Sequence, residues 1–143
     1  MTPAPKPRPP TPLSRASVRA WLVAREPSPP AVLATRLSQC VDSAPDEIFA
    51  CGDLATVVGA LGTWLLKTAL GHHEAASDAA PDAGRPAHDS SDAPPAGSRP
   101  GSRAAALDLL AADALVTYAF EAAAGEGTDV TPLADGLLAQ ISA

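Results

Sequence analysis

Residues 45–70 read PDEIFACGDLATVVGALGTWLLKTAL, and this stretch decides the fold. Large apolar side chains recur along it at helical spacing and leave little polar surface. Pro45, Asp46 and Glu47 stand at its start, which is typical of a helix N-terminus because proline lacks an N–H and acids favour that end of the helix dipole. We therefore expect one helix over 45–70 at the centre of the protein.

Small side chains recur along this stretch at every fourth position, at Cys51, Ala55, Gly59 and Thr63. On a helix they form a ridge that lets a second helix approach closely. A glycine inside a helix costs about 1 kcal/mol relative to alanine, and close packing is the simplest compensation. The four residues are the candidate helix-packing ridge.

Helical periodicity also appears on both sides of this stretch, and no alternating strand pattern does. We expect helices over 13–25, with Ser14 as N-cap, and over 30–42, 103–124 and 132–141, the last with Thr131 as cap. The fold class is therefore all-α, a small irregular bundle of about four to five helices. Aromatic residues make up 3% of the chain and much of the apolar share is alanine, so the core should be thin.

Two segments lack the side chains needed for a core. Residues 1–12 are proline-rich and should form a disordered, extended arm. Residues 71–102 have the composition of a long disordered internal linker. Between and after them lie an N-terminal helical part, 13–70, and a C-terminal helical hairpin, 103–143. The hairpin is too small to fold alone, so we expect it to pack on 13–70 as one composite domain.

Localisation follows from what the chain does not carry. Its uncharged apolar run covers positions 54–66, shorter than the roughly 20 residues of a membrane-spanning helix, so no membrane span is expected. Prolines fill positions 3–12, where a secretory signal would be apolar. Two cysteines are too few for a disulfide framework. A cytoplasmic location is expected, and the Ala/Pro/Arg/Asp-heavy composition is typical of a high-GC bacterial genome.

Charge is divided unevenly along the chain. Residues 1–40 hold six basic residues against one acid, whereas residues 41–143 hold four basic residues against fifteen acids. A basic N-terminal arm could bind nucleic acid or another anionic surface, or it could fold back on the acidic body. The candidate anion-contacting residues are Lys6, Arg8, Arg15, Arg19 and Arg25.

No group of residues predicts a catalytic, cofactor or metal site. His72, His73 and Glu74 are adjacent, so on a helix the two imidazoles diverge and cannot hold one ion together. Asp113 and Glu121 are too far apart along a helix to share a proton.

The two cysteines leave two readings open. Cys40 and Cys51 lie on either side of the turn at Pro45 and could face each other. They could be buried side chains of the core or the two halves of a redox-sensitive bridge.

These features favour a non-catalytic helical protein–protein interaction protein, an adaptor or accessory subunit that binds a larger partner or a second copy of itself. The basic arm supports one alternative, a binder of nucleic acid or of an anionic surface. A small enzyme is the other alternative. No cofactor is expected for any of them.

Overall fold

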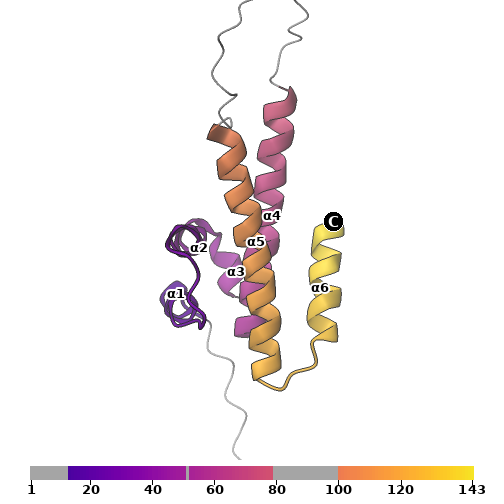
Figure 1. Cartoon of the computed structure of the whole chain (residues 1–143). Coiled ribbons are helices and arrows are strands. Elements are labelled where there is room, and N and C mark those ends of the chain that lie inside the picture. The colour runs from indigo at the N-terminus through magenta and orange to yellow at the C-terminus, as the bar shows by residue number, and fades with distance from the viewer. Residues whose placement is uncertain (1–12, 51, 79–99) are drawn as a thin grey trace, which may run out of the picture.

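A computed structural model of the chain describes residues 13–50, 52–78 and 100–143. These residues contain helices and no strand, which confirms the all-α class (Figure 1). The helices are α1 (Arg15–Val23), α2 (Ala31–Ser43), α3 (Asp46–Phe49), α4 (Leu54–Asp78), α5 (Pro100–Gly125) and α6 (Thr131–Ser142).

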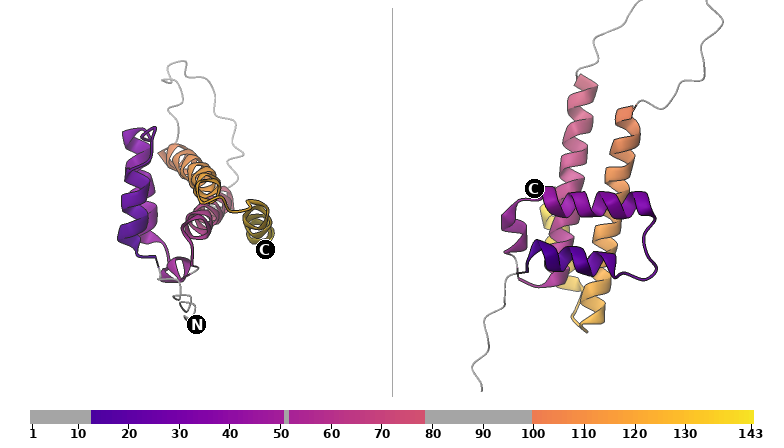
Figure 2. Two further views of the ribbon diagram at one scale, coloured as in Figure 1. Left: turned by 90° about the horizontal axis from the view of Figure 1, so that it is seen from below. Right: turned by 90° about the vertical axis from the view of Figure 1, so that its left-hand side faces the viewer.

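The long helices α4 and α5 run antiparallel and make the most extensive contact in the molecule. Helices α1 and α2 lie across one side of this pair, and α6 lies along the opposite side (Figure 2). Helix α6 runs in the same direction as α4 and ends part-way along it (Figure 1). The pair α4–α5 is therefore a central layer that is covered from two sides.

The core lies where α1, α2 and α3 meet this pair. Its buried side chains are small or aliphatic, apart from one phenylalanine. The alanines among them allow the helices to approach closely. The main members are Val18, Leu22, Leu33, Leu37, Val41, Phe49, Val57, Val58, Leu61, Leu65, Ala111, Ala112, Leu115 and Ala119.

The expectation of one continuous helix over 45–70 is wrong. The short α3 ends at Phe49, and α4 starts at Leu54. Gly52 has φ 109°, a backbone conformation that favours glycine. Asp53 then caps α4, since its carboxylate accepts the N–H of Thr56 at 2.9 Å.

The other helix ends match the sequence expectations in part. Ser14 caps α1 by accepting the N–H of Ser17, as expected. Thr131 is not the cap of α6 but its first residue, and Asp129 Oδ1 accepts the Thr131 N–H instead. Helices α4 and α5 both continue into the segment 71–102, to Asp78 and from Pro100. The rest of that segment, 79–99, and the arm 1–12 lie outside the described residues.

Within the described residues, Leu54–His72 of α4 is long and apolar enough to cross a membrane, with a mean hydropathy of 1.4. Half of this stretch is buried inside the structure. The core helix of a soluble protein meets the same two criteria of length and composition.

Candidate functional site

Helix α6 is held against α4 by one edge of its apolar face. Leu137 is the buried residue of this helix, and its Cδ2 lies over Gly59, 2.9 Å from where a Cβ on that glycine would stand. Leu133, one turn earlier, packs beside Ala55. The missing side chain at Gly59 is what lets α6 come this close.

A second apolar edge of α6 is uncovered. Val130, Leu138 and Ile141 are exposed large apolar side chains, with 63% of Leu138 exposed. Leu138 and Ile141 are three residues apart and lie on one side of α6, next to the edge that Leu137 occupies, and Val130 is the N-cap residue just before the helix. We call these three residues the α6 flank. Leu70 of α4 is likewise exposed.

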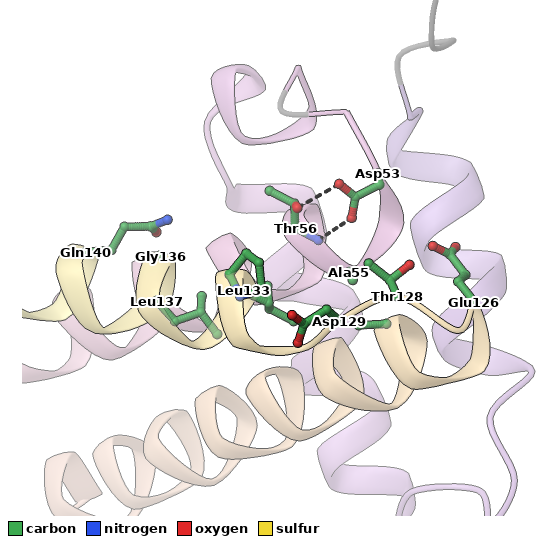
Figure 3. Close-up of a pocket in the computed structure, with 12 residues that line it drawn as sticks. Asp53, Ala55, Thr56, Glu126, Thr128, Asp129, Leu133, Gly136, Leu137 and Gln140 are labelled. Atoms are coloured by element: carbon green, nitrogen blue, oxygen red, sulfur yellow. Dashed lines mark hydrogen bonds between the residues drawn. The ribbon is translucent and has the colours of Figure 1, made fainter.

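Between α6, the start of α4 and the turn after α5 lies a groove with a cavity volume of about 390 Å³ (Figure 3). Small and aliphatic side chains form its apolar part, and carboxylates, hydroxyls and one amide form its polar part. The lining residues are Asp53, Ala55, Thr56, Ala123, Glu126, Thr128, Asp129, Pro132, Leu133, Gly136, Leu137 and Gln140.

Local structure at two helix ends places the carboxylates of the groove. Asp53 is there because it caps α4, and its second oxygen accepts the Thr56 hydroxyl at 2.8 Å. Glu126 and Asp129 lie in the turn between α5 and α6, where Gly127 has φ 67° and lets the chain reverse direction. Three acids from two distant parts of the sequence therefore line one opening.

Two of these acids have a lowered pKa. Burial by itself would raise the pKa of Asp53, but the hydrogen bonds from the Thr56 N–H and hydroxyl and from neighbouring backbone groups outweigh it and lower the pKa. The N–H and hydroxyl of Thr131 lower the pKa of Asp129. Both groups are ionised at neutral pH and are poor proton donors, so they supply negative charge rather than acid catalysis.

The structure places the candidate ridge on the side of α4 that faces α5 and α6. Ala55 is buried with Ala122 and Ala123 of α5. Gly59 faces the side chains of Leu137 and Ala119, which can approach closely because glycine has no side chain. Thr63 is buried, and its hydroxyl donates to the Gly59 carbonyl at 3.2 Å. Cys51 lies outside the described residues.

Each described member of the anion-contacting set is paired with an acid of the same chain. These pairs are Arg15 with Asp46, Arg19 with Asp42 and Arg25 with Glu121. The structure thus directs these charges toward the acidic body of the protein. Lys6 and Arg8 lie outside the described residues.

Arg25 makes the most elaborate of these contacts. Its guanidinium lies 4.5 Å from the ring centroid of Trp21 and 5.4 Å from that of Tyr118, which favours a cation because of the negative ring faces. The two rings themselves meet edge to face at 6.4 Å. Arg25 therefore ties the turn after α1 to α5, with Glu121 as its counter-ion.

Cys40 is a free, buried thiol. Burial raises its pKa to about 11; Arg36 nearby lowers the pKa and Asp108 raises it further, and both effects are smaller than that of burial. The thiol is protonated at neutral pH and is a poor nucleophile. Its proposed partner Cys51 lies outside the described residues, so the bridge between them stays a prediction.

The described residues hold no cluster of three or more His, Cys, Asp or Glu side chains that could bind a metal ion. His72 is exposed on α4, and the side chains of His73 and Glu74 lie outside the described part. No protein-family model, curated protein or solved structure shows a significant match to this chain.

The groove was not predicted from the sequence, although the acids at the two helix starts beside it follow a recognisable pattern. Asp53 followed by Thr56, and Asp129 followed by Thr131, are acids placed to accept N–H groups at helix starts. These patterns mark the two helix ends separately. Their convergence depends on how α6 docks on α4, and no local pattern encodes that docking.

Proposed function

We propose that this chain is a non-catalytic helical protein–protein interaction protein, an adaptor or accessory subunit, that contacts a partner protein through the α6 flank. The observation that carries the proposal is the exposure of Leu138 and Ile141 on α6, and of Val130 just before it, beside the edge at which Leu137 docks on α4. Apolar side chains on one face of a helix are the usual anchors of helix-mediated recognition.

The groove supports the non-catalytic part of this proposal. Its polar side chains are carboxylates, hydroxyls and an amide. Asp53 caps α4, and Asp129 accepts the Thr131 N–H in the turn before α6. A carboxylate that is hydrogen-bonded to the backbone and has a lowered pKa is a weak base.

The alternative, a binder of nucleic acid or of an anionic surface, has less support. Arg15, Arg19 and Arg25 already face acids of their own chain. Each would have to give up that pair before it could neutralise a phosphate. The alternative therefore rests on Lys6 and Arg8.

A comparison of two double variants tests the proposal. Leu138→Ser with Ile141→Ser removes the apolar side chains of the α6 flank, and Val23→Ser with Val32→Ser is the matched control at exposed valines on α1 and α2. Tagged full-length proteins are used to purify partners from the native host, with quantification by mass spectrometry.

The proposal predicts a partner that copurifies with the wild type and the control and is lost with the α6 variant. Self-association would appear in the same series as a mass difference by analytical ultracentrifugation. An identical set of copurified proteins for all three forms, together with a monomeric wild type, would contradict it.

A further inference from the structure

One side of α5 carries a line of exposed side chains, Arg103, Ala106, Leu110, Asp113 and Thr117. Leu110, near the middle of this line, is 53% exposed. The five residues are spaced alternately three and four positions apart, so they follow one face of the helix, with the repeat that is typical of helix–helix interfaces. We call these five residues the α5 stripe.

The neighbouring helices contact other sides of α5. Ala112 and Leu115 face Gly62 of α4, and Asp108 pairs with Arg36 of α2. On a helix with 3.6 residues per turn, these contacts lie about half a turn away from the α5 stripe. The stripe therefore points away from both α2 and α4, the two helices that α5 contacts most (Figure 2).

The two charges of the α5 stripe have no counter-ion among the described residues. Arg103 and Asp113 take part in none of the ion pairs formed within this part of the chain. Neither has an opposite charge three or four positions away on its own helix, where a side chain could reach it. Both charges are therefore available to a second molecule.

The α5 stripe is complementary to itself in the antiparallel direction. When two copies are paired about position 108, Arg103 stands opposite the second copy's Asp113, and Ala106 stands opposite the second copy's Leu110. Twofold symmetry repeats each pairing, so the two ion pairs close both ends of a segment about 15 Å long. A parallel arrangement would instead place Arg103 against Arg103 and Asp113 against Asp113, and like charges repel.

We propose that two copies of this chain associate through antiparallel contact of their α5 stripes. Leu110 and the adjacent Leu109, which is 42% exposed, supply the apolar centre. The pairs of Arg103 with Asp113 set direction and register. One stripe of about three turns is a small contact, so the dimer is reversible and depends on concentration. This contact is separate from the α6 flank and does not rest on the function proposed above.

Analytical ultracentrifugation of the full-length protein over a concentration series tests the contact. Arg103→Asp makes both charges of the α5 stripe acidic, and Asp113→Arg makes both basic. The double variant exchanges the two charges and keeps the net charge of the wild type. Lys67→Asp on α4 and Asp135→Arg on α6 are the matched controls, because both reverse an exposed charge that forms no ion pair with another described residue.

The proposal predicts a wild type that dimerises as its concentration rises. Each single variant should dimerise at least about tenfold more weakly, since two attractions become two repulsions. The double variant should recover the dimer, because each pair forms again in the reverse direction. The two controls, and Leu138→Ser with Ile141→Ser on the α6 flank, should leave it unchanged.

Mixing Arg103→Asp with Asp113→Arg in equal amounts separates a lost contact from a misfolded protein. One variant then presents two acids and the other two bases, so the mixture should form a heterodimer although neither variant dimerises well alone.

The proposal fails if the wild type stays monomeric up to millimolar concentrations. It also fails if Arg103→Asp leaves the dimer intact, since the contact then lies elsewhere or in another register. A mixture of the two single variants that remains monomeric would overturn it as well.

Discussion

Asp53 lies where the chain passes from the turn after α3 into α4, and it fixes the start of the central helix. Its two carboxylate oxygens accept the N–H and the hydroxyl of Thr56. These bonds stabilise the ionised form in the folded state, so the pKa there is below the ordinary value of 3.8. Asp53 therefore contributes stability above pH 3.8, and that contribution is lost as the pH falls through the lowered pKa.

Comparison of Asp53→Asn with the wild type isolates this charge, because asparagine is also a good N-cap. We expect the wild type to be the more stable of the two at neutral pH, by a fraction of a kcal/mol for this largely exposed group. The difference should shrink at acid pH, below 3.8. Urea unfolding at a series of pH values measures it, and Asp53→Ala, which also removes the cap, should cost about 1 kcal/mol at neutral pH. A difference that stays constant into strong acid would contradict this assignment.

For single residues, the sequence predicted local contacts such as helix caps, but it did not predict which distant residues form ion pairs. Ser14 was recognised as a cap because its bond to Ser17 is local. The pairing of Arg25 with Glu121 joins the turn after α1 to α5, and it depends on how those helices are rotated against each other. The order of charged residues along the sequence does not determine how two helices are rotated against each other.

Two glycines of α4 show how this element packs. A Cβ on Gly62 would stand 3.0 Å from Val116 Cγ2 and 3.1 Å from the backbone oxygen of Ala112. A Cβ on Gly59 would meet the end of the Leu137 side chain, which can turn aside. The backbone of α5 cannot move as easily, because it is packed on both α2 and α4.

We therefore expect Gly62→Ala to destabilise the protein by about 1–2 kcal/mol, since overpacking outweighs the gain in helix propensity. Gly59→Ala should cost less. Gly71→Ala is the control: nothing lies within 4 Å of its Cβ position, so it should stabilise the protein by up to about 1 kcal/mol. Denaturant unfolding ranks the three variants. Equal effects at Gly62 and Gly71 would show that α5 does not pack closely on α4.

Element positions could largely be predicted from helical periodicity, and the errors have physical causes. The break between α3 and α4 was missed because the apolar spacing continues across Gly52 and Asp53. The ends of α4 and α5 extend beyond the expected boundaries because alanines such as Ala75 and Ala76 favour helix by their intrinsic propensity. Apolar periodicity does not detect a helix segment that is formed by alanine propensity alone.

For the whole molecule, helical periodicity predicted the all-α class, and the high share of alanine predicted a thin core. The contacts between α4 and α5 are indeed rich in alanine, with Ala112, Ala119 and Ala123 buried on α5. The relative placement of the helices could not be read from the chain. The groove exists because α6 seats Leu137 over Gly59, and the sequence shows a small-residue ridge without saying which helix covers it.

The N-terminal part, 13–78, and the C-terminal part, 100–143, pack against each other along α4. We therefore expect neither part to be stable without the other. The most direct test separates the chain into fragments 13–78 and 100–143 and follows each by circular dichroism during heating. We expect 100–143 alone to show no cooperative transition, and we expect mixing the two fragments in equal amounts to increase the helical signal. A monomeric 100–143 fragment that melts cooperatively by itself would contradict it.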